Sequence, residues 1–313
     1  MEDVLILGGG PAGYTAALYC VRAGMRARVL ETLMPGGQMG TTEMIENYPG
    51  FPQGVGGFDL AQSMQKQAER FGAVTALENV RSVALEGPVK SVTCQSGKTY
   101  QARTVILATG AAPRELGLPN EHALRGKGVS YCATCDGMFY RGKEVVVVGG
   151  GNTAAADAVY LSKLCSSVTV VHRRDKLRAS GEYKRPLEQA GNVRIVWDSV
   201  VTAIQGEPVS GVRLKHVKTG VEDTLPCSGV FVAVGSVPNT AFLAGQVKLT
   251  ENGSIDAGED TCTSVPGVFA AGDVRRKPLR QVVTAVADGA VAAHMAEEYM
   301  ATHGGALASG AVL

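Results

Sequence analysis

Cys132 and Cys135 are the residues of this chain best suited to redox chemistry, because only two residues separate them. Cysteines at this spacing can form a small, readily reduced disulfide, and the thiolate is the form that exchanges with other disulfides. Asp136 follows the pair and is a candidate acid/base for the accompanying proton transfer. The structural alternative for Asp136 is a turn or a cap. The remaining cysteines lie apart from one another, and we interpret them as packing residues.

A glycine-rich turn lies on each side of the cysteine pair, at residues 8–13 and 149–154. Each turn follows a short apolar run and precedes an alanine-rich segment, which predicts a buried parallel strand, a tight turn and a helix. Glycines let the backbone approach a pyrophosphate, to which the helix N-terminus offers its N–H groups. The sequence therefore predicts two dinucleotide sites. Their turn residues are Gly8, Gly10, Pro11, Ala12 and Gly13 in the first and Gly149, Gly151, Asn152 and Thr153 in the second.

The two units differ at the end of their second strands. In the first unit Glu31 ends this strand and is placed to accept hydrogen bonds from a ribose. A basic run stands at the same spacing in the second unit, and guanidinium groups suit a phosphate monoester. The second site is therefore expected to prefer NADPH over NADH, with a solvated basic loop as the alternative. The basic residues are His172, Arg173, Arg174 and Arg178.

Further apolar segments end in glycine and complete the two units. Residues 104–110 end in Thr109 and Gly110, and residues 229–235 are their counterpart in the second unit. A last such segment ends at Asp273, whose carboxylate can accept a hydrogen bond from a cofactor hydroxyl or cap a helix. Because this segment follows the second unit, it is expected to return to the first domain.

We therefore predict an α/β fold with two Rossmann-like dinucleotide-binding domains, the second inserted into the first. Residues 1–112 and 242–313 are expected to form the first domain, and residues 113–241 the second, which carries the cysteine pair. The tail at residues 302–310 is rich in glycine and alanine and is expected to be loosely ordered.

Composition narrows the possible partners of the 313-residue chain. A net charge of +1 gives no electrostatic case for nucleic acid or a membrane surface, and 5% aromatic residues argue against base stacking. No apolar stretch approaches the ~20 residues that span a bilayer, and the acidic start is unlike a signal peptide. Seven scattered cysteines argue against a secreted scaffold, so we expect a cytoplasmic protein. The dispersed histidines and the single cysteine pair argue against a metal site.

Short motifs along the whole chain follow the order found in one enzyme family. They lie at residues 8–13, 36–38, 46–50, 108–110, 132–137, 149–154, 172–175 and 271–273. On these residues the chain resembles the low-molecular-weight thioredoxin reductases. Larger flavin disulfide reductases place their cysteines near the first glycine turn and continue into a C-terminal interface domain. The basic stretch at residues 274–279 is less similar to the family.

The resemblance implies one FAD per subunit in the first domain, NADPH as co-substrate, oxidised thioredoxin as substrate, and a homodimer. It also implies that Cys135 faces the flavin and that Cys132 attacks the protein disulfide. The implied FAD contacts are Glu31, Gly36, Gly37, Gln38, Asn47, Asp273, Arg280 and Gln281.

The predicted activity is thioredoxin-disulfide reduction, with electrons passing from NADPH through FAD and the cysteine pair. The dithiol and the nicotinamide site share one domain, yet each must come within about 3–3.5 Å of the same flavin. We therefore expect the inserted domain to rotate about linkers near Pro113 and Pro238. The alternatives are a flavin-dependent dithiol oxidase, a reductase for a glutaredoxin-like or peroxidase-linked carrier, and a flavin redox sensor that does not turn over.

Overall fold

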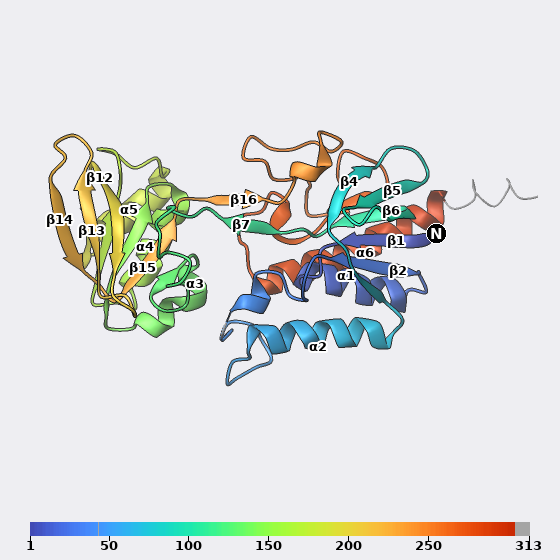
Figure 1. Ribbon diagram of the computed structural model, residues 1–313, viewed down its shortest axis with the longest axis horizontal. Coiled ribbons are helices and arrows are strands. Elements are labelled where there is room, and N and C mark those ends of the chain that lie inside the picture. The colour runs from blue at the N-terminus through green and yellow to red at the C-terminus, as the bar shows by residue number, and fades with distance from the viewer. Residues whose placement is uncertain (43, 304–313) are drawn as a thin grey trace, which may run out of the picture. The chain divides into compact units, whose positions relative to one another are not determined.

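The computed structural model describes residues 1–42 and 44–303, which divide into two compact units (Figure 1). The first unit comprises Met1–Ala112 together with the chain from Val237 onward, and the second unit is Pro113–Ser236. The second unit is therefore inserted into the first.

The two connections between the units run side by side. Strand β7 (Ala111–Pro113) pairs with strand β16 (Ser236–Pro238) in a two-stranded sheet. Immediately after β16, the Asn239 N–H donates to the Gly110 carbonyl at 3.0 Å. The chain has therefore returned to the first unit before residue 242, where the sequence placed the boundary.

Within the described residues, the first unit is built on a seven-stranded sheet with the order β3-β2-β1-β6-β5-β4, in which β17 also pairs with β6. The pairs among β1, β2, β3, β6 and β17 are parallel, whereas β4 and β5 join in antiparallel fashion. The strands are β1 (Glu2–Leu7), β2 (Ala27–Glu31), β3 (Val74–Leu77), β4 (Val80–Ala84), β5 (Lys90–Cys94), β6 (Thr99–Leu107) and β17 (Val268–Ala270).

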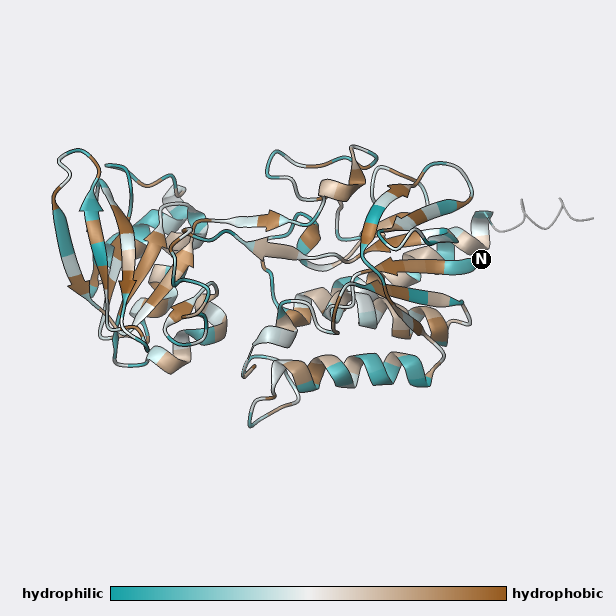
Figure 2. Cartoon of the chain, viewed as in Figure 1, coloured by the Kyte–Doolittle hydropathy of each residue, from teal (hydrophilic) through white to brown (hydrophobic). Residues whose placement is uncertain are grey.

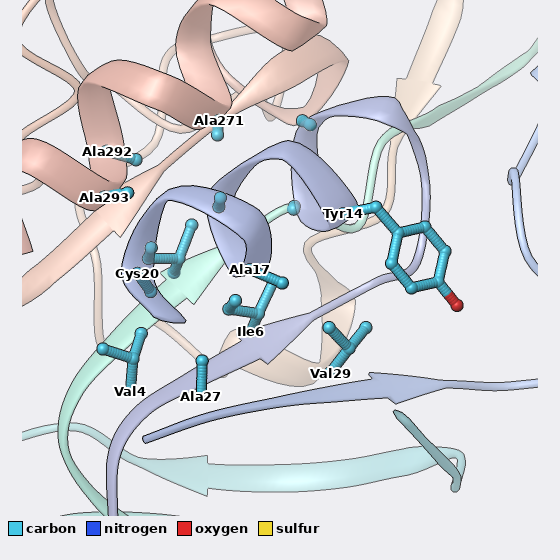
Figure 3. Packing of buried hydrophobic residues seen from close by; sticks show 14 of the residues in the cluster. Val4, Ile6, Tyr14, Ala17, Cys20, Ala27, Val29, Ala271, Ala292 and Ala293 are labelled. Carbon is cyan, nitrogen blue, oxygen red and sulfur yellow. The ribbon is translucent and has the colours of Figure 1, made fainter. Parts of the chain in front are cut away.

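Small side chains pack the helices of the first unit onto this sheet. Figure 3 shows Val4 and Ile6 of β1 below Ala17 of the first helix, with Ala292 of the last helix beyond. The last helix continues through residue 303, so Thr302 is helical rather than part of a loose tail, and the expected tail from residue 304 lies outside the described residues. None of the described helices is both long and apolar enough to cross a membrane. The helices are α1 (Pro11–Arg22), α2 (Gly57–Arg70) and α6 (Val282–His303), with 3-10 turns η1 (Met39–Thr41), η3 (Ala241–Leu243) and η4 (Gly272–Val274).

The second unit contains a parallel sheet with the order β11-β10-β9-β15-β8 and a smaller antiparallel sheet, β12-β13-β14. Hydrophobic residues run along the strands of the parallel sheet (Figure 2), as expected for strands covered on both faces. This architecture confirms the predicted α/β class. The elements are β8 (Val129–Ser130), α3 (Ala133–Asp136), η2 (Gly137–Tyr140), β9 (Glu144–Gly149), α4 (Asn152–Ser162), β10 (Ser167–Val171), α5 (Gly181–Gln189), β11 (Val193–Val196), β12 (Ser199–Gln205), β13 (Gly211–His216), β14 (Glu222–Pro226) and β15 (Gly229–Ala233).

Candidate active site

Cys132 and Cys135 form a disulfide in the second unit. Cys132 immediately precedes α3, and its carbonyl accepts hydrogen bonds from the N–H groups of Cys135 (3.3 Å) and Asp136 (3.1 Å). Both cysteines are half-buried. A Cβ built on Gly137 would lie 3.0 Å from the Tyr160 ring, so η2 approaches α4 closely. The disulfide is therefore held in a short helical turn that is packed against α4.

Asp136 is linked to the disulfide through Ser130, a residue that the sequence did not single out. The buried Ser130 Oγ donates to Asp136 Oδ2 at 2.6 Å and accepts the Cys132 N–H at 3.1 Å. Burial raises the pKa of Asp136, although the Ser130 hydrogen bond acts in the opposite direction. A raised pKa is what an acid/base group needs in order to hold a proton closer to neutral pH. No sequence pattern points to Ser130, because only the folded turn brings the two side chains together.

The first glycine turn connects β1 to α1 and leaves an open approach to the helix N-terminus. Gly8 has φ +108°, a conformation that favours glycine, and a Cβ on Gly13 would collide with the Gly8 carbonyl oxygen. A Cβ on Gly10 would meet nothing nearer than the Gly36 carbonyl oxygen at 4.0 Å. Pro11 begins α1 and Ala12 is buried behind it. The N-terminus of α1 therefore has room for a diphosphate.

Glu31 and the loop at Gly36 lie against this turn. The Glu31 carboxylate accepts the N–H groups of Gly9 and Thr32, both at 2.7 Å. The Gly36 N–H donates to the Gly9 carbonyl at 2.7 Å, and a Cβ on Gly37 would lie 3.9 Å from Gly10. The Leu33 N–H also donates to Glu31 Oε1, at 3.3 Å, so three backbone N–H groups orient the carboxylate. Its Oε2, which accepts the Gly9 N–H, can accept a further hydrogen bond from a ribose hydroxyl.

Residues from the C-terminal part of the chain meet the loop that contains Asn47. Asn47 Nδ2 donates to Gln281 Oε1 at 2.8 Å, and Gln281 Nε2 donates to the Arg280 carbonyl at 2.7 Å. Arg280 Nε in turn donates to the Asp273 carbonyl at 3.3 Å. The structure therefore brings together four predicted FAD contacts that are far apart in the sequence.

The buried carboxylate of Asp273 is the feature of this unit that best fits a bound cofactor. It lies in η4, and its Oδ1 is buried with no hydrogen-bond partner among the described residues. Burial raises the pKa of Asp273, while the charges of Lys277 and Arg280 act to lower it. A buried acceptor without a donor costs free energy, which a cofactor hydroxyl at this position would recover. The residues of this unit therefore fit a hydroxyl-bearing dinucleotide.

Gln38 and Thr109 bond instead to the connections between the units. Gln38 Nε2 donates to the Ala111 carbonyl, and Thr109 Oγ1 donates to the Asn239 carbonyl at 2.9 Å. Asn239 Nδ2 returns a hydrogen bond to the Thr109 carbonyl at 2.8 Å. The sequence did not indicate Asn239, because 130 residues separate it from its partner.

The second glycine turn connects β9 to α4, and the basic loop is hydrogen-bonded to it. The Arg178 N–H donates to the Gly150 carbonyl at 2.7 Å, and the Ser180 N–H donates to Asn152 Oδ1 at 2.8 Å. No atom lies within 4 Å of a Cβ built on Gly151, and the neighbouring Thr153 is exposed. The loop thus places its basic residues beside an open helix N-terminus.

The basic residues of this loop divide into two kinds. His172 is only 5% exposed, its ring lies where a Cβ on Gly150 would be, and its Nε2 lies 3.1 Å from the Lys176 carbonyl oxygen. Burial lowers the pKa of His172 and so favours the neutral ring. The arginines at 173, 174 and 178 are exposed and form no ion pair within the described residues. The imidazole is thus placed to support the loop, and the guanidinium groups are placed to meet an anion.

Comparison with known proteins gives the family. Residues 2–289 match the family described as pyridine nucleotide-disulphide oxidoreductase. A thioredoxin reductase of Mycolicibacterium smegmatis is 48% identical over 306 residues, which cover 96% of this chain and 97% of the relative. The chain belongs to the thioredoxin reductase family. A solved thioredoxin reductase from Streptococcus pyogenes is 43% identical and aligns with a TM-score of 0.89 over 96% of this chain and 99% of that one.

A further relative is named as both a thioredoxin reductase and a thioredoxin. The "Bifunctional thioredoxin reductase/thioredoxin" of Mycobacterium leprae is 44% identical over 311 residues, which cover 99% of this chain and 68% of the relative. Membership of the family confirms the predicted resemblance, the two dinucleotide-binding domains, the oxidoreductase activity, and FAD and NADPH as cofactors. The contacts of individual residues with these cofactors stay predictions.

Replacing Asp136 tests its role as the acid/base in thioredoxin reductase chemistry. Asp136→Asn should lower kcat about 10²-fold and remove the acid limb of its pH profile. Because the pKa of Asp136 is raised, its carboxylate becomes protonated, and unable to accept a proton, at a higher pH than an ordinary aspartate. The measurement is kcat with a disulfide substrate from about pH 5 to 9. Asp223→Asn on exposed β14 should keep the wild-type profile, and the same profile in Asp136→Asn would exclude the role.

Replacing the exposed arginines tests the nucleotide preference of the second site. The double change Arg173→Gln and Arg174→Gln should raise the KM for NADPH at least about tenfold and leave the KM for NADH unchanged, since only NADPH carries the additional phosphate. Steady-state kinetics with both nucleotides measure this. Arg194→Gln is the control, because its guanidinium bonds to Thr169 at 2.8 Å on the sheet. An unchanged preference in the double variant would assign these arginines to a solvated loop.

Proposed function

We propose that this protein is an NADPH-dependent thioredoxin-disulfide reductase that passes two electrons from NADPH to oxidised thioredoxin. The observation that carries the proposal is the Cys132–Cys135 disulfide, linked to Asp136 in the unit that also contains the second glycine turn. The fused relative named as both reductase and thioredoxin supports thioredoxin as the protein substrate.

We assign FAD to the first unit, where the open N-terminus of α1 and the unpartnered Asp273 Oδ1 support the assignment. FAD supplies the two-electron chemistry that joins a hydride donor to a disulfide. The assigned FAD residues are Gly8, Gly10, Pro11, Ala12, Gly13, Glu31, Gly36, Gly37, Gln38, Asn47, Thr109, Gly110, Asp273, Arg280 and Gln281.

We assign NADPH to the second unit, where three exposed arginines border the open N-terminus of α4. In this assignment the arginines contact the phosphate monoester, and the buried His172 holds their loop. The assigned NADPH residues are Gly149, Gly151, Asn152, Thr153, His172, Arg173, Arg174 and Arg178.

The cysteines carry the electrons onward by thiol–disulfide exchange. The Cys132 thiolate attacks one sulfur of the thioredoxin disulfide, forms a mixed disulfide and releases the other thioredoxin sulfur as a thiolate. Cys135 then loses its proton to Asp136 and attacks the Cys132 sulfur, which reforms the Cys132–Cys135 bond and frees reduced thioredoxin. Ser130 keeps Asp136 next to the pair during both steps.

Two large apolar side chains are exposed beside the disulfide. Met138 and Phe139 follow the pair and are 44% and 47% exposed, large values for side chains of this kind. Exposed apolar groups beside a reactive pair are typical of a protein-docking site. We assign them to the docking of thioredoxin.

The remaining features of the proposal follow from the family resemblance and the linkers. The two paired connections, β7 and β16, support a second unit that rotates so that NADPH and the disulfide reach FAD in turn. A cytoplasmic homodimer completes the proposal.

An assay of NADPH oxidation tests the function against its alternatives. NADPH consumption should depend on oxidised thioredoxin and should yield two thioredoxin thiols for each NADPH. Equal consumption with oxygen alone would indicate a dithiol oxidase. NADPH binding without turnover under any condition would indicate a redox sensor.

A further inference from the structure

A buried ionic cluster follows the Asp273 turn. The side chains of Arg275 and Lys277 are each 3% exposed, and both reach Asp288 of α6, which is 8% exposed. Arg275 binds the Asp288 carboxylate with two nitrogens, at 2.9 and 2.7 Å, and Lys277 Nζ donates to it at 2.7 Å. The sequence shows this segment only as a basic stretch. In the fold the side chains of Arg275 and Lys277 are interior, and these two cations share one buried carboxylate.

The same carboxylate ties the turn to α6. Asp288 Oδ2 also accepts the Gly272 N–H at 2.8 Å, and Lys277 Nζ donates to the Thr284 carbonyl at 3.2 Å. Asp288 therefore fixes the residue directly before Asp273, and Lys277 joins the turn to the first turns of α6. Bonds of this kind leave the turn little freedom to move relative to the helix.

The cluster has an excess of positive charge beside Asp273. Glu259 lies 3.7 Å from Arg275, but its side chain is 92% exposed and therefore compensates little. Burial of Asp273 is the largest influence on its pKa and raises it, and the Asp288 charge acts in the same direction. The charges of Lys277 and Arg280 act to lower it. These are the charged groups that Asp273 faces.

The ionisation of Asp273 matters because its buried oxygen lacks a partner. An ionised carboxylate accepts a charge-assisted hydrogen bond from a hydroxyl, which is stronger than the bond that the neutral, protonated group can make. A buried carboxylate stays ionised only when a nearby charge compensates its desolvation. Two cations share one carboxylate in the cluster, which leaves one positive charge in excess, and the charge of Lys277 acts to lower the pKa of Asp273.

We propose that Arg275, Lys277 and Asp288 form a positioning cluster for FAD, in which Asp288 fixes the turn and Lys277 keeps Asp273 ionised as the acceptor for a cofactor hydroxyl. The inference rests on the proposed function, which assigns FAD to this unit. Lys277 is a positioning residue, because it acts on FAD through Asp273.

The test is the pH dependence of FAD affinity in full-length Lys277→Gln, followed by flavin fluorescence. Protonation of Asp273 removes the negative charge that strengthens this hydrogen bond, so the affinity for FAD should fall as the pH is lowered through the pKa of Asp273. Loss of a nearby positive charge raises that pKa, and the fall in Lys277→Gln should begin about one to two pH units higher than in wild type. At a pH between the two pKa values, where Asp273 is ionised in wild type but protonated in Lys277→Gln, the affinity of the variant should be about tenfold to a hundredfold weaker. The two affinities should converge once Asp273 is protonated in both proteins.

Three comparisons keep the result specific. Lys248→Gln removes an exposed lysine that pairs with Asp256 at 3.1 Å in the same unit and should keep the wild-type profile. Asp273→Asn should bind FAD weakly with no pH dependence in this range. Adding Lys277→Gln to Asp273→Asn should then have no further effect.

The outcomes separate the inference from the function on which it rests. The inference would be overturned if Lys277→Gln kept the wild-type pH profile of FAD affinity. It would also be overturned if Lys277→Gln weakened FAD binding equally in the wild-type and the Asp273→Asn backgrounds. If Lys277→Gln does not fold, Lys277→Met makes the same charge change with an apolar stem. Failure of the wild-type protein to bind FAD would instead refute the proposed function.

Discussion

Cys135→Ser should abolish turnover with oxidised thioredoxin, lowering kcat at least about a thousandfold, and should trap the substrate as a stable mixed disulfide. The remaining Cys132 thiol can still attack the thioredoxin disulfide. Serine cannot then displace the mixed disulfide, because its hydroxyl is a poor nucleophile toward sulfur. Non-reducing gel electrophoresis and mass spectrometry of the trapped adduct, together with NADPH oxidation, measure the two effects.

The trapping experiment has two controls. Cys132→Ser should lose turnover and trap no thioredoxin, since it lacks the attacking thiol. Cys262→Ser, a change to a half-buried cysteine of the first unit, should retain turnover. Trapping by Cys132→Ser but not by Cys135→Ser would reverse the assigned roles. Full turnover in either CxxC variant would remove the pair from the reaction.

Asp288→Ala should give the largest loss of stability, about 3–5 kcal/mol, because it leaves two buried cations without a counter-charge. The measurement is denaturant unfolding followed by circular dichroism. The matched control is Asp256→Ala, which breaks exposed pairs with Lys248 and Arg276 and should cost much less. Replacing Arg275 and Lys277 with Met and Asp288 with Leu in one variant should recover most of the lost stability, since an apolar cluster leaves no buried charge.

The effect of Asp288→Ala should depend on pH. Burial acts to raise the pKa of Asp288, but the hydrogen bonds from Arg275 and Lys277 outweigh it, and the pKa lies below its usual value. A lowered pKa contributes stability above the unfolded value of about 4, and this stability is lost as the pH falls through the folded value. The wild-type and Asp288→Ala midpoints should therefore converge in acid. A difference no larger than that of Asp256→Ala at neutral pH would contradict the assigned role of the cluster.

The sequence was informative where chemistry depends on local spacing. The two glycine turns, the strands that precede them and the CxxC pair each involve residues within one short segment, so their geometry follows from residue type and order. The α/β class follows from the same patterns. For these features, periodicity and turn chemistry leave few alternatives.

The sequence was less informative where partners are distant. Ser130, Asn239 and Asp288 bond to residues that no spacing rule connects to them, and only the fold brings these groups together. His172 looked like one of a basic run, yet burial separates its ring from the exposed arginines. The domain boundary expected at residue 242 lies a few residues after the point where the chain rejoins the first unit. No local pattern around Asn239 indicates that its N–H bonds to the Gly110 carbonyl.

The paired connections have a consequence for how such a protein can arise. The hydrogen bond between Asn239 and Gly110 on one side, and the 2.9 Å bond from Arg114 N–H to the Gly235 carbonyl on the other, keep entry and exit adjacent at both ends of the β7–β16 ribbon. The chain therefore leaves the first unit and returns to it at adjacent points, and the same holds for the start and the end of the second unit. Because the two ends of the second unit leave the first unit at adjacent points, a domain can be inserted there without disturbing the host sheet.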